Sequence, residues 1–214
     1  MNAYIHPTAL IEDGVDIGHD SAVWDGVHIR RNTRIGHHCI IGEKTHIGYD
    51  VRIGDLVKVN SFVYICTAVT LDDGVMISAG CIFTNDRYPR ATEPELMSLR
   101  SSEPDLQTLP TLVRTGATLG AGTIIGCNLT IGRFAMVGMG SVVTRPIDDF
   151  HLAIGNPARV VGYVCRCGKP FAKFEPGHHP EQIVHGCAVC RRRYTTRSGV
   201  VGESFAAITL AARR

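Results

Sequence analysis

The sequence has few aromatic residues, no long apolar run and almost no charge imbalance. Aromatics make up 7% of the 214 residues, and a net charge of +2 gives no reason to expect a polyanion such as nucleic acid as partner. No apolar run approaches the roughly 18 residues that cross a bilayer, and the N-terminus lacks a basic segment followed by an apolar one. We therefore expect a cytoplasmic globular protein, with one large domain or one domain and a small appendage.

Cysteine is unevenly distributed along the chain. Four of the eight cysteines occur in two close pairs. In a reducing compartment, close pairs favour a metal site over a disulfide. The paired residues are Cys165, Cys167, Cys187 and Cys190, and the scattered ones are Cys39, Cys66, Cys81 and Cys127.

A six-residue repeat runs through the first part of the chain and resumes after a gap. Every sixth residue is apolar, often with Gly after it and with a small or β-branched residue two places before it. The apolar positions are Ile5, Ile11, Ile17, Val23, Ile29, Ile35, Ile41, Ile47, Ile53, Val59, Ile65, Leu71, Ile77 and Phe83, then Val113, Leu119, Ile125, Ile131, Val137 and Val143.

This period predicts an all-β, parallel β-helix. An α-helix repeats every 3.6 residues, and sandwich strands recur every ~8–12 residues, so neither fits a period of six. Each hexad forms a short flat strand whose apolar residue points into a narrow prism, and the Gly junction supplies a corner where a side chain or an ordinary φ is awkward. Three hexads close one triangular coil, so residues 18 apart stack in columns about 4.8 Å apart.

The repeat is interrupted over residues 84–112, where charge, Pro and Ser dominate. A loop of this length in a compact repeat fold is usually functional or disordered. It could form one wall of a cleft with a neighbouring subunit. It could equally be a tolerated surface insertion, because long loops cost little in closure entropy.

The hexads resemble those of the left-handed parallel β-helix acyltransferases, over residues 1–163. This resemblance implies a left-handed coil, a homotrimer, and acetyl-CoA bound between neighbouring prisms. The periodicity itself predicts only the coil.

Four segments resemble one branch of that family, the N-acetyltransferases of nucleotide-linked amino sugars: "FTNDRYPRA", "PTLVRTGATLGAGTIIG", "VGMGSVVTRPI" and "AIGNPARVVGYV". The resemblance implies acetyl transfer to the 3-amino group of a UDP- or dTDP-linked sugar, with Asn85 at the active site. An amide takes up no proton near neutral pH, so Asn85 would hold the amine or donate to the oxyanion. Its alternative role is to stabilise a local turn.

The remaining site residues follow from the same comparison. The expected substrate-binding residues are Asp86, Arg87, Tyr88 and Arg90; the arginines suit a diphosphate or a uronate, or are solvated loop charges. The expected cofactor-binding residues are Gly120, Ala121, Gly138, Met139, Arg145, Asn156, Pro157 and Arg159. Gly122 and Gly140 would also let pantetheine approach the backbone, although in the simpler interpretation these glycines only turn corners. His28, His46 and Tyr64 form one outward column, and the two histidines are candidate proton acceptors if they do not simply pack a trimer or face solvent.

The C-terminal part reads as a separate appendage. Two cysteine pairs on separate turns let four thiolates converge on a structural Zn²⁺, so residues 164–194 are expected to form a zinc-ribbon-like module held by Cys165, Cys167, Cys187 and Cys190. Residues 195–214 would be a tail that is either frayed or forms a short helix. Alternative functions are an O-acetyltransferase of the same fold, a non-catalytic zinc-ribbon scaffold, or a γ-carbonic anhydrase-like enzyme, although the His-x4-His spacing of the last is absent.

Overall fold

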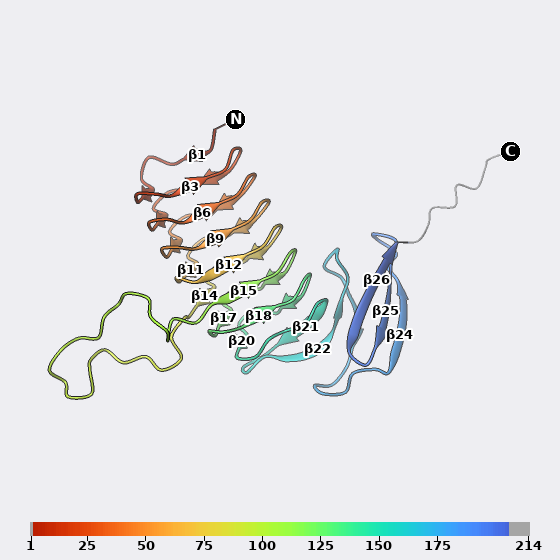
Figure 1. Cartoon of the computed structure of the whole chain (residues 1–214). Coiled ribbons are helices and arrows are strands. Elements are labelled where there is room, and N and C mark those ends of the chain that lie inside the picture. Colours follow the sequence, from red (N-terminus) through yellow and green to blue (C-terminus); the bar gives the residue numbers. More distant parts are fainter. Residues whose placement is uncertain (1, 206–214) are drawn as a thin grey trace.

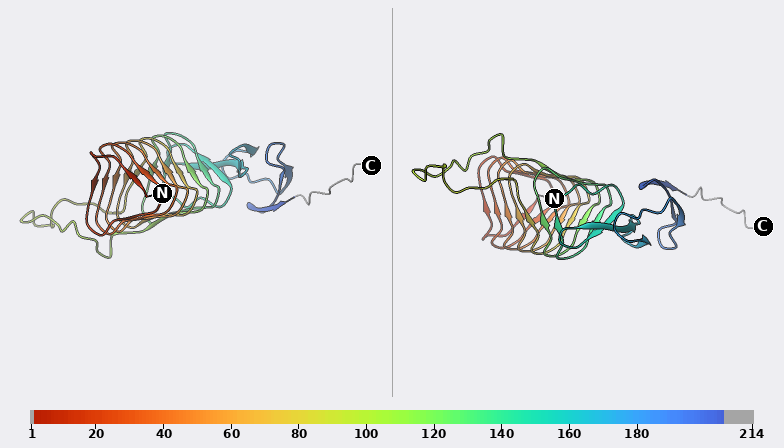
Figure 2. Two further views of the ribbon diagram at one scale, coloured as in Figure 1. Left: turned by 90° about the horizontal axis from the view of Figure 1, so that it is seen from above. Right: turned by 90° about the horizontal axis from the view of Figure 1, so that it is seen from below.

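The protein is a triangular β-solenoid followed by a small C-terminal module. The computed structural model describes residues 2–205, and within that range there is no helix. The coils stack along one axis, a long loop leaves the solenoid on one side, and the C-terminal module lies at the far end on the other side (Figures 1 and 2). No described helix is long and apolar enough to cross a membrane. The predicted all-β, left-handed parallel β-helix is confirmed.

Successive strands pass to successive faces of the prism, so each face is a parallel sheet of every third strand. Face A contains β1 (Tyr4–Ile5), β4 (Ala22–Val23), β7 (Ile40–Ile41), β10 (Lys58–Val59), β13 (Met76–Ile77), β16 (Thr118–Leu119), β19 (Met136–Val137) and β21 (His151–Ile154). Face B contains β2 (Leu10–Ile11), β5 (His28–Ile29), β8 (His46–Ile47), β11 (Tyr64–Ile65), β14 (Ile82–Phe83), β17 (Ile124–Ile125) and β20 (Val142–Val143). Face C contains β3 (Asp16–Ile17), β6 (Arg34–Ile35), β9 (Arg52–Ile53), β12 (Val69–Leu71), β15 (Thr111–Val113) and β18 (Thr130–Ile131). We name the edges between them corner AB, corner BC and corner CA.

The prism is filled by the two repeating positions that the sequence predicted. The apolar hexad residues are buried from Val23 onward, and so are the residues two places earlier, such as Cys39, Val51 and Cys81. Residues 18 apart pair in neighbouring coils, so that similar side chains stack on one another, as Ile29 does on Ile47. The solenoid therefore has one continuous core whose register is fixed by the local repeat.

The glycines after the apolar positions have a different role from the one expected. Their φ angles are ordinary, and the left-handed residues lie three places before the apolar one, such as Asn32 and His38 with φ of 60° and 56°. Space is what excludes a side chain. A Cβ at Gly42 would lie 2.6 Å from the carbonyl carbon of Asn60 in the next coil, and one at Gly48 would lie 2.7 Å from the backbone nitrogen of Thr67.

The interruption leaves the solenoid at corner BC and returns to it without disturbing the register. Phe83 still pairs with Ile125 across the gap, and Val69 pairs with Thr111. The loop therefore ends at residue 110, two residues earlier than expected. Its base is closed by a bridge between Asp86 and Thr108.

The C-terminal module consists of antiparallel strands. β22 (Arg159–Val164) folds back on β21 and pairs with β23 (Pro170–Lys173), and β24 (Gln182–Gly186), β25 (Arg192–Arg197) and β26 (Val200–Phe205) form a separate sheet. The expected tail is wrong over residues 195–205, because they belong to β25 and β26; residues 206–214 lie outside the described part. Tyr194 joins the module to the last coil by packing against Phe150, with 5.6 Å between ring centroids.

Candidate functional site

Asn85 lies at the base of the loop, directly after β14, and is half-buried. Its side-chain Nδ2 donates to the carbonyl of Thr67 at 3.4 Å, which is a long hydrogen bond. Its own carbonyl accepts from the backbone N–H of Leu109 at 2.8 Å, at the other end of the loop. The backbone of Asn85 thus clamps the loop, while its amide group is only weakly engaged.

The coil register places Asn85 in a column along corner BC. Thr67 and Tyr49 stand 18 and 36 residues earlier, and the pairings of Phe83 with Ile125 and Ile125 with Val143 put Cys127 and Arg145 next in line. Arg145 is exposed and lies two coils from Asn85, or roughly 10 Å at the usual strand spacing.

A cavity of about 290 Å³ opens beside Asn85, between corner BC and the returning arm of the loop. We call it the Asn85 cavity. Its wall on the coils includes His46, Tyr64 and Cys66, and the loop contributes Ser102 and Glu103. The loop is held over this wall by Tyr49, whose hydroxyl donates to the carbonyl of Ser102 at 3.0 Å, and by an ion pair of 3.2 Å between Arg31 and Glu103.

A carboxylate–histidine pair lies next to the cavity and was not anticipated from the sequence. Glu12 Oε1 lies 2.9 Å from His28 Nε2 and 2.8 Å from Arg30 Nε, and Glu12 Oε2 accepts from the backbone N–H of Arg31. The Arg31 N–H, followed by the bond to His28, lowers the pKa of Glu12. The 16-residue offset from Glu12 to His28 crosses between neighbouring coils, so the column rule of 18 does not reveal it.

His46 is packed between His28 and Tyr64, and its ring stacks on Tyr64 at 5.3 Å and meets His28 edge-on at 5.0 Å. Burial, and then the neighbouring His28 and Arg30 charges, lower the pKa of His46, so the imidazole is neutral near pH 7. Burial also raises the pKa of Cys66 to about 12. The cavity therefore offers a neutral imidazole and an amide, and its thiol stays protonated and poorly nucleophilic.

The four expected substrate residues occupy the first turn of the loop, and all are exposed. The carboxylate of Asp86 accepts from the backbone N–H of Tyr88 at 2.8 Å, which is a local turn contact. Arg90 bonds its neighbouring Pro89 carbonyl and lines a small cavity that also includes Asn85 and Arg100. Arg87 and Tyr88 are exposed and line none of the cavities described here.

The expected cofactor residues fall on two different corners. Gly120, Ala121, Gly138 and Met139 stack at corner AB, where the N–H of Gly140 bonds the carbonyl of Ala121. The turn with Asn156 and Pro157 joins the same corner, because Gly155 and Ala158 pair with Val142. Arg145 stands instead at corner BC, and Arg159 begins β22 at the edge of face A. Within one chain, face B separates the corner AB glycines from Asn85.

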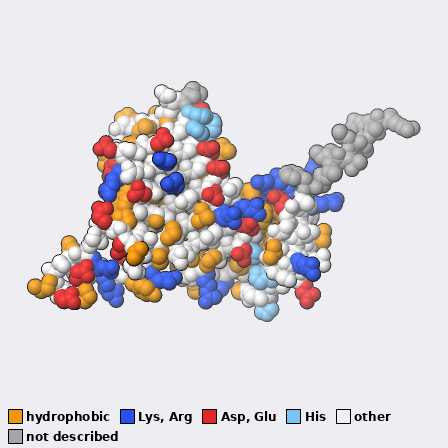
Figure 3. All heavy atoms as spheres, viewed as in Figure 1, with side chains coloured by type: hydrophobic (Ala, Val, Ile, Leu, Met, Phe, Trp, Pro, Cys, Tyr) orange, Lys and Arg blue, Asp and Glu red, His pale blue; other side chains and the backbone are white. Residues whose placement is uncertain are grey.

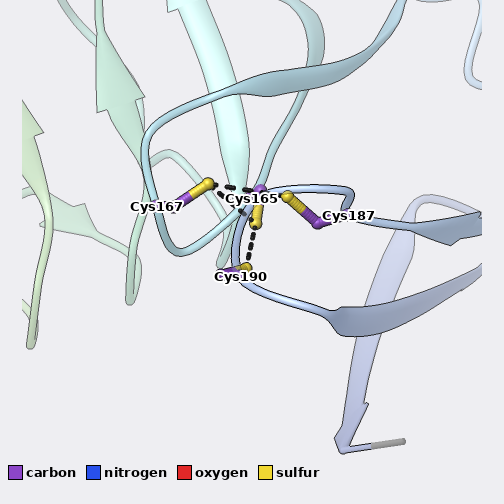
Figure 4. Close-up of side chains that lie close together, drawn as sticks. All are labelled: Cys165, Cys167, Cys187 and Cys190. Atoms are coloured by element: carbon purple, nitrogen blue, oxygen red, sulfur yellow. Dashed lines mark hydrogen bonds between the residues drawn. The ribbon is translucent and has the colours of Figure 1, made fainter.

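The four paired cysteines converge on one point, from two turns of the C-terminal module (Figure 4). Sγ separations are 3.2 Å for Cys165 and Cys190, 3.4 Å for Cys165 and Cys167, and 3.6 Å for Cys167 and Cys187. These distances exceed a disulfide bond. They approach the ~3.8 Å edge of a tetrahedron of thiolates around Zn²⁺ at about 2.3 Å. The residues present fit a four-thiolate zinc site.

Neighbouring groups hold the cysteine cluster in place. The backbone N–H groups of Cys190 and Val189 lower the pKa of Cys187 to about 6. The buried hydroxyl of Tyr194 lies 3.3 Å from Cys165 Sγ, accepts from the N–H of Arg166, and lies 3.2 Å from Glu203. A Zn²⁺ ion held by all four thiolates would have no open position for water.

Comparison with known proteins finds amino-sugar and serine acetyltransferases. The chain is 42% identical over 95 residues to dTDP-3-amino-3,6-dideoxy-alpha-D-galactopyranose 3-N-acetyltransferase of Aneurinibacillus thermoaerophilus, over 44% of each chain. It is 46% identical over 50 residues to serine acetyltransferase of Escherichia coli (strain K12), over 23% of this chain and 18% of that one. The matched part thus spans less than half of either relative. No protein-family model matches the chain.

Solved structures with a similar outline include PerB from Caulobacter crescentus in complex with CoA and GDP-perosamine. It has a TM-score of 0.43 and 26% identity, and the match covers 76% of this chain and 58% of that one.

Proposed function

We propose that this chain, whose resemblance to the hexapeptide-repeat acetyltransferases is supported by its similarity to the dTDP-amino-sugar relative, transfers acetyl from acetyl-CoA to the 3-amino group of a UDP- or dTDP-linked amino sugar. One observation carries the proposal. Asn85, the residue that the family motif places at the active site, lies in a cavity with a neutral imidazole and without an ionised nucleophile.

These groups suit direct attack in a ternary complex. The amine nitrogen forms a bond to the thioester carbon, the carbon–sulfur bond breaks, the thiolate leaves with the electron pair, and the amine loses one proton. An amide donor at Asn85 stabilises the oxyanion or orients the amine. Its weak bond to Thr67 at 3.4 Å leaves it able to turn to the substrate.

His46 is the group best suited to accept the proton. It lines the same cavity as Asn85, and its burial keeps it neutral near pH 7. An acceptor with a pKa near or below the working pH is ready to act. Glu12 holds His28 through the 2.9 Å contact to its Nε2, and His28 meets the ring of His46 edge-on, so Glu12 and His28 are positioning residues.

Loop and corner BC arginines would bind the anionic part of the nucleotide sugar. Arg87 and Arg90 stand on the first turn of the loop, and Arg145 lies in the Asn85 column; all three are exposed. A guanidinium binds a diphosphate bidentately. Asp86 and Tyr88 would complete the wall, with Asp86 holding the turn.

The cofactor site is completed by a second subunit. Corner AB presents the backbone of Gly122 and Gly140, where a Cβ would meet nothing within 4 Å, so an extended pantetheine arm can lie against it with Met139 alongside. Because face B separates this corner from Asn85 in one chain, acetyl-CoA reaches Asn85 only across an interface. Asn156, Pro157 and Arg159 would lie toward its adenosine end.

Face B supports a homotrimer. Its outward column is apolar and aromatic, and much of it is exposed in the single chain, whereas the matching column of face C begins with Asp16, Arg34 and Arg52. The exposed members of the face B column are Leu10, Tyr64, Ile82 and Ile124. The loop also carries exposed Leu96, Met97 and Leu106, consistent with a loop that reaches a neighbour. A stable monomer on sedimentation would contradict this assembly.

A single Zn²⁺ per chain, held by the four paired cysteines, would stabilise the C-terminal module. The supporting observation is the tetrahedral spacing of the sulfur atoms. The solenoid has its own core, so we expect it to stay folded without the metal.

The proposed activity is tested by a turnover assay. The purified chain is incubated with acetyl-CoA and a panel of UDP- and dTDP-linked 3-amino sugars, with the matched 3-hydroxy sugars as controls. We expect release of the CoA thiol and an N-acetylated product with at least one amino sugar and none of the hydroxy sugars. Turnover of the hydroxy sugars instead would indicate an O-acetyltransferase, and no turnover with any acceptor would favour the scaffold role.

A further inference from the structure

A second cavity lies away from the Asn85 cavity, where the solenoid meets the C-terminal module. It measures about 580 Å³ and is enclosed by corner CA and the last coil on one side and by the β25–β26 turn on the other. We call it the junction cavity. Neither the acetyl transfer nor the zinc site uses it, and its size suits a small ligand.

Basic groups line the solenoid side of the junction cavity. Arg114 follows β15 at corner CA, and none of the described residues pairs with its guanidinium. Arg133 follows β18 one coil later; its Nε and its backbone N–H bond the two carboxylate oxygens of Asp149 at 2.7 Å each, which occupies Asp149 and leaves the terminal nitrogens of Arg133 available. Lys and Arg side chains gather on the surface at this junction (Figure 3).

The rest of the lining is polar at one place and apolar at another. His151 is buried, and its Nδ1 bonds the carbonyl of Asp149 at 2.9 Å, so the other ring nitrogen remains for a ligand. Asp148 lines the cavity, and its carboxylate repels an inorganic anion. The same carboxylate can accept hydrogen bonds from hydroxyl groups. Ile147 on the solenoid side and Val200 on the hairpin side are apolar.

We propose that the junction cavity binds a nucleoside phosphate. Arg114 and the free end of Arg133 hold the phosphate, because guanidinium groups match its oxygens bidentately. Asp148 accepts from the sugar hydroxyls, and the base lies between Ile147 and Val200 within reach of His151. A simple inorganic anion would use only the arginines and would meet the unpaired Asp148 charge, so the lining favours the nucleotide over the free ion.

Such a ligand would add contacts between the solenoid and the β25–β26 hairpin, beside the packing of Tyr194 against Phe150. Arg114, Arg133 and Asp148 belong to the solenoid, whereas Val200 belongs to the β25–β26 hairpin. Binding therefore couples the order of the module to the presence of the nucleotide. The site lies at corner CA, away from both corners proposed for acetyl transfer, so its failure leaves the proposed activity untouched.

Hydrogen–deuterium exchange of the full chain tests the site locally. UDP and inorganic phosphate are titrated separately, and exchange is followed in peptides that contain residues 146–151 and 198–201. We expect UDP to slow exchange in both segments, with a dissociation constant raised at least about tenfold in Arg114→Ala, the loss typical of a charge-assisted hydrogen bond. The matched control is Arg52→Ala, an exposed arginine on face C nearer the N-terminus, which should bind UDP like the wild type.

Four results would overturn the proposal. One is unchanged exchange in these segments at saturating UDP. Another is equal protection of wild type and Arg114→Ala, and the third is equal weakening by Arg114→Ala and Arg52→Ala, which would indicate a general charge effect. Protection by phosphate alone at the same concentration as UDP would contradict the nucleotide assignment, because the sugar and base would then add nothing.

Discussion

Replacing Asn85 by Ala should separate catalysis from stability. The hydrogen bond from the Asn85 side-chain amide to the carbonyl of Thr67 is long, at 3.4 Å, and only partly buried. Its loss should therefore lower the free energy of unfolding by at most about 1 kcal/mol. The backbone bond from Leu109 to Asn85 survives the substitution, and the loop stays clamped. For a chain of this size we expect Tm to fall by no more than about 2–4 °C.

The expected loss of activity is far larger. Removing one oxyanion donor or one positioning contact slows acetyl transfer by about one to three powers of ten. The effect should appear in kcat/KM for the sugar, measured as CoA thiol released per unit time at several sugar concentrations. Asn85→Asp should be at least as slow, because a carboxylate has lost the donor and carries negative charge toward the oxyanion.

The matched control is Asn60→Ala, another half-buried asparagine, at corner AB on an early coil. It should keep both Tm and kcat/KM near those of the wild type. Full kcat/KM in Asn85→Ala would refute the catalytic role of this amide and leave only its turn contacts. A large fall in Tm would show that the loop is held by the side chain, contrary to the long bond observed.

Further predictions concern the loop, the metal, pH and the coil packing. Arg87→Ala should raise the sugar KM and spare the acetyl-CoA KM, because it removes ground-state binding; an unchanged sugar KM would return Arg87 to a solvated loop charge. Elemental analysis under reducing conditions should find one zinc per chain, and metal-free wild-type protein would refute the site. The Cys190→Ser variant should contain much less zinc. It should also be cleaved faster by protease after Val164, while the solenoid stays intact. Burial lowers the folded-state pKa of His46 and His151, so the unfolded chain takes up protons before the folded chain does as pH falls below about 6.5. The free energy of unfolding should therefore decline between pH 6.5 and 5. His46→Gln should make this decline less steep, and a wild-type free energy that does not change with pH would contradict the lowered pKa values. Gly42→Ala should cost about 1–3 kcal/mol in chemical denaturation, because its Cβ would lie 2.6 Å from the Asn60 backbone; an unaffected midpoint would show that the coils can separate at this contact.

The solenoid could be predicted from the sequence because its register is a local property. Each hexad specifies its own strand and inward residue, so Ile29, Ile47 and Ile65 stack without any long-range information. The same rule of 18 would have joined Thr67 to Asn85, and continuing it past the loop would have moved Arg145 to corner BC.

The parts that were missed depend on contacts between distant segments. The Glu12–His28 pair joins neighbouring coils at an offset of 16 residues, which the repeat of 18 does not mark. The strands at the end of the module were also missed, although they show a local pattern. Tyr194 and Thr196 are buried while Thr195 and Arg197 are exposed, a period of two typical of a strand, and the turn at Ser198 and Gly199 has the positive φ values of a tight hairpin.

Because the base of the loop is closed, the loop can change in length and sequence without disturbing the coils on either side. Asn85 and Leu109 are joined by one backbone hydrogen bond, and the coil on either side keeps its register. Because the two ends already meet, doubling the loop length adds only about 0.6 kcal/mol of closure entropy. Evolution can therefore vary the length and composition of this segment, and with them the proposed acceptor site, while the solenoid that supports it remains the same.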